Sequence, residues 1–224
     1  MMIQTSKKSP KKGKKSGIST KEKIFNVSID LFSQRGYNGV SVREIAREVG
    51  IRESSIYNHY GSKDAIMDSI FQYFKEELTK MRPPEAENRE KLDNITPEIF
   101  IERANRTLNL FETPKMEKIF RIISNEQFRD KRAKKIVLEY LIHEPYSFSK
   151  KVLEIMMRKG TTDKFDPKIK AMEFQYPMYS LFLENLLLRS DGADTSANEK
   201  LIESHLEYFV NSLKKSKSKF PTDH

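Results

Sequence analysis

The stretch SVREIAREVGIRESSIYNHYGSK, residues 41–63, guides the interpretation of the whole chain. Ser41 is followed three residues later by a glutamate, a pairing that caps a helix by satisfying its free backbone N–H groups. Ala46 is small enough for a second helix to cross closely, and Gly50 supplies a residue that readily adopts positive φ where the first helix ends. Ile56 follows Gly50 by six residues. This spacing predicts a helix-turn-helix of the kind that binds DNA.

The same stretch resembles the DNA-binding domain of the TetR family of transcriptional regulators, and the resemblance extends from about Lys21 to Phe71. Upstream it rests on residues of a first helix and the Gly-aromatic pair that ends it, namely Ile24, Phe25, Ser28, Leu31, Phe32, Gly36 and Tyr37. Downstream, IYNHYGSKDAI (56–66) matches the segment that leads from the recognition helix into a fourth helix. Arg52 departs from the pattern, since many members have Ser or Thr as the cap there, a role that Ser54 and Ser55 could partly fill.

The resemblance implies which residues contact the DNA backbone: Ser41, Ser55, Tyr57 and Lys63. Lys63 lies at the start of the expected fourth helix, where backbone N–H groups and the helix dipole favour a phosphate. Arg43 matches a position that reaches a base edge in some members, and its guanidinium suits guanine O6 and N7. The exposed face of the recognition helix is predicted to consist of Arg52, Glu53, Ser54 and Asn58.

Some of these residues have alternative interpretations. Tyr57 could pack between helices instead of donating to a phosphate, and Glu53 could be solvated instead of accepting from cytosine N4. Asn58 could contact adenine or a phosphate. We interpret His59 as a packed, hydrogen-bonded side chain and not as a catalytic group.

Positive charge is concentrated in the same part of the chain. Residues 1–63 contain 13 Lys and Arg against five Asp and Glu, a net charge of +8. The other 161 residues contain 28 basic and 27 acidic side chains, a net charge of +1. This asymmetry is typical of a phosphate-facing module joined to a neutral partner domain, although a basic tail can also serve solubility alone.

We predict an all-α fold in which an N-terminal three-helix helix-turn-helix domain precedes a larger helical domain. The expected parts are a disordered basic tail (1–18), the helix-turn-helix domain (19–64), an effector-binding and dimerisation domain (65–213) and a frayed basic tail (214–224). Threonine-proline pairs predict helix starts at 96–97 and 113–114. Breaks are expected near Pro145 and Pro177, residues 129–135 are expected to form a solvated helix face, and the last helix is predicted to be capped by Ser196.

Two apolar faces indicate a homodimer that reads two half-sites. One is formed by Ile202, Leu206, Phe209 and Leu213 in the last helix, and the other by residues of the preceding helix that include Met178, Leu181 and Phe182. Paired across two subunits, they would form a four-helix interface. The alternative is that both faces belong to the core of the monomer.

The resemblance also implies a small-molecule effector, for which the residues give a weaker indication. Side chains that combine an apolar body with a polar tip gather around the expected helix breaks: Tyr140, His143, Tyr146, Phe148, Met156, Tyr176 and Tyr179. Such a mixture suits a ligand cavity and also suits an ordinary helical core.

Composition argues against other function classes. Cys is absent, which rules out disulfides and thiolate metal sites, and we expect no metal and no cofactor. No apolar run approaches the roughly 18 residues of a membrane span, and no apolar core follows the N-terminal lysines, so a cytoplasmic protein with no membrane partner is expected. The four His are scattered and no HExxH, Gly-rich phosphate loop or GxSxG occurs, so we expect no enzyme. The remaining alternative is a helical interaction module or a sequence-independent nucleic-acid-binding protein.

Overall fold

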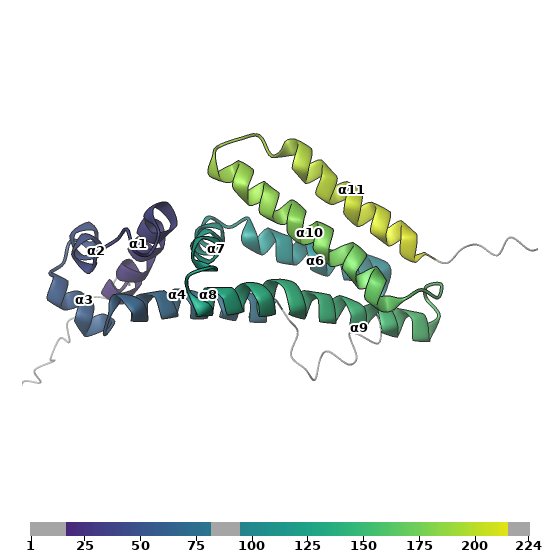
Figure 1. The fold of residues 1–224 in the computed structure, drawn as a ribbon, viewed down its shortest axis with the longest axis horizontal. Helices are drawn as coiled ribbons and strands as arrows, with labels where there is room; N and C mark the ends of the chain where they lie inside the picture. Colours follow the sequence, from purple (N-terminus) through teal and green to yellow (C-terminus); the bar gives the residue numbers. More distant parts are fainter. Residues whose placement is uncertain (1–16, 82–94, 215–224) are drawn as a thin grey trace, which may run out of the picture.

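The computed structural model describes residues 17–81 and 95–214, and every regular element in those ranges is a helix (Figure 1). The all-helical fold is therefore confirmed. The N-terminal part contains α1 (Thr20–Arg35), α2 (Val42–Val49), α3 (Glu53–His59) and α4 (Lys63–Lys80). The second part contains α6 (Pro97–Phe111), α7 (Pro114–Glu126), α8 (Lys131–Ile136), the π-helix η1 (Val137–His143), α9 (Glu144–Lys159), α10 (Pro167–Ser190) and α11 (Ser196–Leu213). The tails expected at 1–18 and 214–224 lie almost entirely outside the described residues.

Side-chain caps fix where several helices begin. Ser19 accepts a hydrogen bond from the Glu22 N–H at the start of α1, and Ser62 accepts one from the Ala65 N–H at the start of α4. The cap predicted for the last helix was displaced by one residue: Thr195, not Ser196, is the N-cap of α11, and its side chain makes no capping hydrogen bond.

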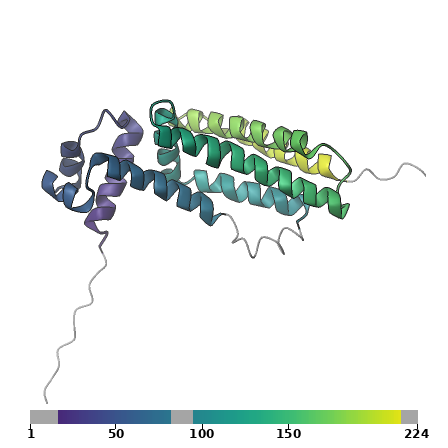
Figure 2. The ribbon, with the colours of Figure 1, turned by 60° about the horizontal axis from the view of Figure 1, so that its bottom comes forward.

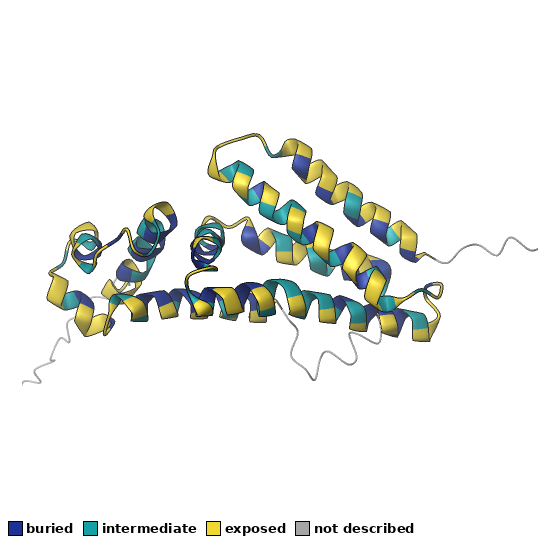
Figure 3. Ribbon diagram, in the orientation of Figure 1, coloured by how far each residue is buried: buried dark blue, intermediate teal, exposed yellow. Residues whose placement is uncertain are grey.

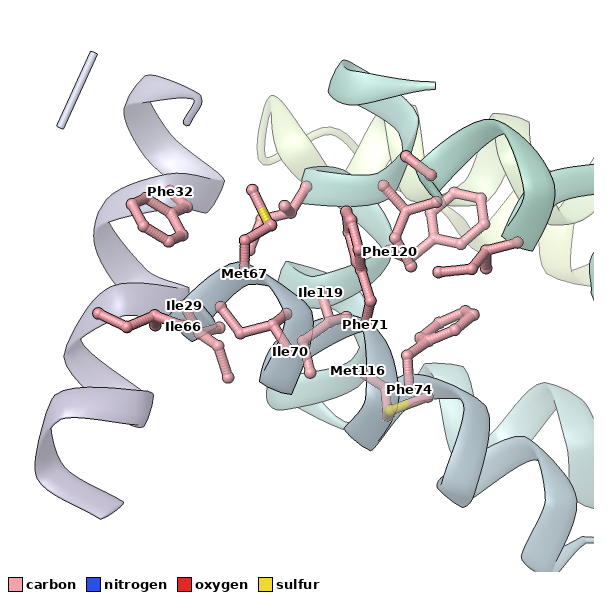
Figure 4. Packing of buried hydrophobic residues seen from close by; sticks show 14 of the residues in the cluster. Ile29, Phe32, Ile66, Met67, Ile70, Phe71, Phe74, Met116, Ile119 and Phe120 are labelled. Carbon is pink, nitrogen blue, oxygen red and sulfur yellow. The ribbon is translucent and has the colours of Figure 1, made fainter. Parts of the chain in front are cut away.

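One hydrophobic core joins the two parts of the chain (Figure 4). Phe32 of α1, Ile70 of α4 and Ile119 of α7 are fully or almost fully buried in it. Because α1 and α4 both pack directly on α7, the N-terminal helices are held against the second part of the chain (Figures 1 and 4).

A second core lies between α6, α9, α10 and α11, and it contains most of the proposed dimer residues. Phe174 is at its centre, with ring centroids 4.8 Å from Phe100 and 4.6 Å from Phe209. The buried members of the predicted interface are Met178, Ile202, Leu206, Phe209 and Leu213, while Leu181 and Phe182 are partly buried against the cores. In the described chain these residues therefore pack within their own subunit, which is the alternative that the sequence left open.

The expected break near Pro145 is a π-helical turn within one long rod formed by α8, η1 and α9 (Figures 1 and 2). The Glu144 N–H donates to the carbonyl of Glu139, five residues earlier. This wider turn makes room for the Pro145 ring, which would clash with the carbonyl four residues before it in an α-helix. Helix α10 likewise continues through Pro177. None of the described helices is long and apolar enough to span a bilayer.

Candidate nucleic-acid interface and ligand cavity

The helix-turn-helix has the local geometry that the sequence predicts. The Ser41 hydroxyl accepts from the Glu44 N–H at 3.2 Å, and the Ser41 N–H donates to the Glu44 carboxylate at 2.8 Å, so the capping box is complete. Gly50 has a φ of 77°, a left-handed conformation that glycine adopts without steric cost. Ala46 and Ile56 are buried where α2 and α3 cross. The turn therefore fixes the orientation of α3 relative to α2.

Most of the residues predicted to face DNA are exposed, as is most of α3 (Figure 3). The exposed ones are Ser41, Arg43, Arg52, Glu53, Ser54, Tyr57 and Asn58, while Ser55 and Lys63 are half-buried. Tyr57 is 49% exposed and thus projects outward. Arg52 is the N-cap of α3, but its side chain makes no capping hydrogen bond. His59, which we expected to be packed, is exposed at the end of α3, so that prediction was wrong.

Lys63 holds the loop between α1 and α2. Its ammonium donates to the carbonyls of Tyr37 at 2.9 Å and Val40 at 2.8 Å, and it lies 4.0 Å from the centroid of the Tyr37 ring. Burial lowers the pKa of Lys63, whereas Glu126 and Glu44 act in the opposite direction. An ammonium has three N–H donors, so one remains for a phosphate.

Ser41 and Glu44 belong to a second network on the same surface. The Ser41 hydroxyl donates to Glu44 at 2.8 Å, so a phosphate contact by Ser41 would require this bond to break. Arg35 donates to the Gly39 carbonyl at 2.5 Å and to Glu44 at 2.7 Å, which ties α1 to α2. The hydrogen bond from the Ser41 N–H, followed by those from Arg35 and the Ser41 hydroxyl, lowers the pKa of Glu44 to about 2.

Ionic contacts connect the helix-turn-helix part to the second part. Arg132 of α8 donates to Asp64 and Asp68 of α4 and to Asp130. Residues 129–135 were expected to form a solvated helix face, and for Arg132 that prediction was wrong. Three carboxylates converge on its guanidinium, and their hydrogen bonds raise its pKa further. Spacing along the chain does not reveal this cluster, because Asp64 is distant in sequence.

Two further contacts join α1 and its following loop to α7. The Lys118 ammonium lies 2.6 Å from the Asp30 carboxylate. The carboxylate of Glu126, a buried residue, accepts from the Tyr37 N–H at 3.1 Å. The loop that Lys63 holds is therefore also tied to the end of α7.

A cavity of about 340 Å³ lies between the end of α4, α6, the η1–α9 region and α10. Of the seven predicted effector residues, Tyr140, Phe148 and Tyr179 line it. His143 and Tyr176 are exposed, Met156 is buried in the second core, and Tyr146 does not reach the cavity wall. The wall contributed by α6, which includes Phe100, Arg103 and Thr107, was not predicted from the sequence. No helix break marks that wall in the sequence.

Several apolar side chains of α10 and α11 are exposed in the part of the chain that the structure describes. These residues are Ile169, Met172, Tyr176 and Leu187 in α10, and Leu201 and Tyr208 in α11. In α10 they recur at helical spacing on the side away from the buried Phe174 and Met178. In α11, Leu201 and Tyr208 lie two turns apart beside the buried stripe. Exposed apolar side chains grouped in this way are typical of a protein interface.

Residues 24–75 match the family model described as bacterial regulatory proteins, tetR family. Among curated relatives, the biofilm operon icaADBC HTH-type negative transcriptional regulator IcaR of Staphylococcus epidermidis is 38% identical over 58 residues, which are 24% of this chain and 31% of that protein. The Staphylococcus aureus (strain Newman) regulator of the same name is 42% identical over 48 residues, 21% of this chain and 26% of that protein. The matches thus span less than a third of these relatives.

Solved structures match over far more of the chain. A regulatory protein of the tetR family from Rhodococcus RHA1 has a TM-score of 0.60 at 15% identity, over 88% of this chain and 98% of that chain. A TetR-family transcriptional regulator from Agrobacterium tumefaciens has a TM-score of 0.58 at 19% identity, over 84% and 96%. Fold and exposed surface define a helix-turn-helix protein with a helical partner region. Residues 24–75 therefore belong to the tetR family of bacterial regulatory proteins, and the fold of the described chain is that of solved TetR-family regulators.

Proposed function

We propose that this protein is a transcriptional regulator that binds a palindromic operator as a homodimer and is released from it by a small molecule. The exposed face of α3, carried on a capped helix-turn-helix, is the observation that carries the proposal. Repression is the favoured outcome, because the IcaR relatives are named negative regulators.

Contacts that position the protein on DNA are separate from those that read its sequence. For positioning, we propose the Tyr57 hydroxyl, the third N–H of Lys63 and the half-buried hydroxyl of Ser55. For contacts with the base edges, we propose Arg43 and the exposed residues of α3 and its cap, which are Arg52, Glu53, Ser54 and Asn58. Arginine and asparagine match the acceptor and donor edges of guanine and adenine in the major groove.

We propose a dimer because a single α3 can contact only a few base pairs. We propose that the outward faces of α10 and α11, which include Leu187, Leu201 and Tyr208, pack against the same faces of a second copy. This surface replaces the buried stripe of α11 as the interface. A two-fold arrangement would present two copies of α3 to successive major grooves.

The cavity and the Arg132 cluster support regulation by a ligand. Tyr140 lines the cavity from η1, and η1 continues directly from α8, which carries Arg132. We propose that ligand binding shifts the rod formed by α8, η1 and α9. The ion pairs of Arg132 would transmit this shift to α4. The ligand must bind the DNA-incompetent conformation more tightly than the competent one, since equal affinity shifts nothing.

Selection of bound duplexes from a random pool tests the proposal. We expect a palindromic consensus whose half-sites are one helical turn apart or a multiple of it. Competition against random duplex then separates this proposal from the alternative of sequence-independent binding. If random duplex competes as well as the selected one, the protein is not an operator-binding regulator.

A further inference from the structure

Arg103 of α6 brings a positive charge to the wall of the cavity. Its Nη1 atom is buried and has no hydrogen-bond partner among the residues that the structure describes. Arg106, almost one turn later in the same helix, instead pairs with Glu102 at 2.6 Å on the surface. A buried N–H group without a partner costs free energy that an acceptor on a ligand would recover.

The other polar groups of the wall have less need of a ligand. The Gln175 amide donates to the hydroxyl of Ser149, and the Thr107 hydroxyl donates to the backbone carbonyl of Arg103. Glu144 also lines the cavity and already has an interaction partner. The guanidinium is therefore the group in the described wall that most needs an acceptor.

Most of the remaining wall is apolar and aromatic: Leu78, Phe100, Leu108, Phe111, Phe148, Phe174, Met178 and Phe182. These side chains favour a ligand with a hydrocarbon or aromatic body, because binding removes apolar surface of both the ligand and the wall from water. At about 340 Å³, the cavity is at the small end of the range for ligand sites.

We propose that the cavity binds an amphipathic monocarboxylate, with its acid group on Arg103 and its apolar body against the phenylalanine rings. The inference rests on the proposed effector role of this cavity and adds the chemical class of the ligand. A guanidinium matches a carboxylate with two parallel hydrogen bonds, and a water-poor wall strengthens such a pairing.

Matched probes test the class of ligand. Binding of decanoate, decanol and decylamine to the full chain is measured by titration calorimetry, and 4-phenylbutanoate and its alcohol repeat the comparison with an aromatic body. We expect each acid to bind about 10- to 100-fold more tightly than its alcohol, the range that a charged hydrogen bond supplies. Acids that bind no better than the alcohols, or an amine that binds best, would overturn the proposal.

Two variants test the residue. Arg103→Gln is expected to weaken acid binding by about 10- to 100-fold and to leave alcohol binding unchanged. Arg106→Gln, on the same helix but outside the cavity wall, should leave both unchanged. Retained alcohol binding shows that Arg103→Gln is folded. Equal losses in the two variants, or retained acid binding in Arg103→Gln, would show that Arg103 does not bind the acid.

A separate measurement distinguishes this inference from the proposed function. Release of a selected operator by decanoate and by 4-phenylbutanoate is followed by fluorescence anisotropy. If an acid binds through Arg103 without releasing DNA, the ligand class is supported and the effector role is refuted. If the alcohols release the operator as effectively as the acids, regulation through the cavity is supported and the carboxylate assignment is wrong.

Discussion

Arg132 binds both carboxylate oxygens of Asp64, with Nη2 2.7 Å from Oδ1 and Nη1 3.0 Å from Oδ2. Asp64 lies in the first turn of α4, a few residues after α3 ends, and Arg132 lies in the helix that leads into η1. This two-bond contact therefore joins the segment behind the recognition helix to α8, the helix that continues into η1 and the cavity wall. Asp68 extends the contact by another turn of α4.

Replacing Arg132 with glutamine should loosen this connection. We expect Arg132→Gln to lower the free energy of unfolding by about 1 kcal/mol, a modest value because more than a third of the side chain is exposed. Amide hydrogen exchange in the first turns of α4 should become faster, because two carboxylates lose their partner. Urea unfolding and exchange mass spectrometry measure the two effects.

Lys134→Gln is the control for Arg132→Gln, since Lys134 is an exposed cation of the same helix. It should leave both stability and exchange in α4 unchanged. If the two variants behave alike, the effect of Arg132 is one of overall charge and not of the contact with Asp64.

Gly39 is fixed by the loop that precedes α2. A Cβ atom at this position would overlap the backbone carbonyl oxygen of Arg35, which cannot move without distorting the end of α1. Gly39→Ala is expected to destabilise the protein by about 1–3 kcal/mol. Gly61→Ala is the matched control, because a Cβ atom there meets nothing within 4 Å. Thermal unfolding compares them, and equal melting temperatures would contradict the packing described for Gly39.

Glu44 should make stability depend on pH in the acid range. Its pKa is about 2 in the folded chain, below the ordinary 4.5, so its contribution is fully present above about pH 4.5 and is lost as pH falls toward 2. Wild type should therefore be more stable than Glu44→Gln near neutral pH, and the difference should shrink steadily below about pH 4.5. Unfolding in urea at several pH values tests this, and a constant difference would exclude the carboxylate as its source.

Lys63 and Tyr57 separate support of the fold from contact with DNA. Lys63→Ala should lower the melting temperature, because two loop carbonyls lose their donor, and should flatten the salt dependence of binding by about one unit of log–log slope. Tyr57→Phe should weaken binding to operator and random duplex alike without changing the melting temperature. Anisotropy titrations over a range of salt measure both. An unchanged slope for Lys63→Ala would restrict Lys63 to its structural role.

Local signals predicted the helix-turn-helix well. Ser41, Gly50 and Ile56 act through contacts within about fifteen residues, and the structure reproduces the cap, the left-handed turn and the buried crossing that they imply. The exposed face of α3 follows from the same periodicity. The threonine-proline starts of α6 and α7 are local in the same sense.

Contacts between distant residues could not be predicted in this way. The periodicity of Ile202 and Phe209 identified an apolar stripe correctly, but periodicity does not say whether a stripe faces the core or a partner. The cluster around Arg132 and the position of Arg103 in the cavity wall depend on how whole helices pack. Neither has a spacing that a single sequence reveals.

The outward surface of α10 and α11 provides the last prediction. Leu201 and Tyr208 are 55% and 72% exposed within one chain, so substituting Leu201 with glutamate should cost the monomer little. Across a two-fold interface the same change would bury two charges beside apolar side chains, which is strongly unfavourable. We therefore expect Leu201→Glu to sediment as a monomer near 26.3 kDa and to lose operator affinity, while wild type sediments as a dimer. Phe128→Glu, at an exposed phenylalanine between α7 and α8, is the control and should remain dimeric. A dimeric Leu201→Glu would place the interface elsewhere on the chain.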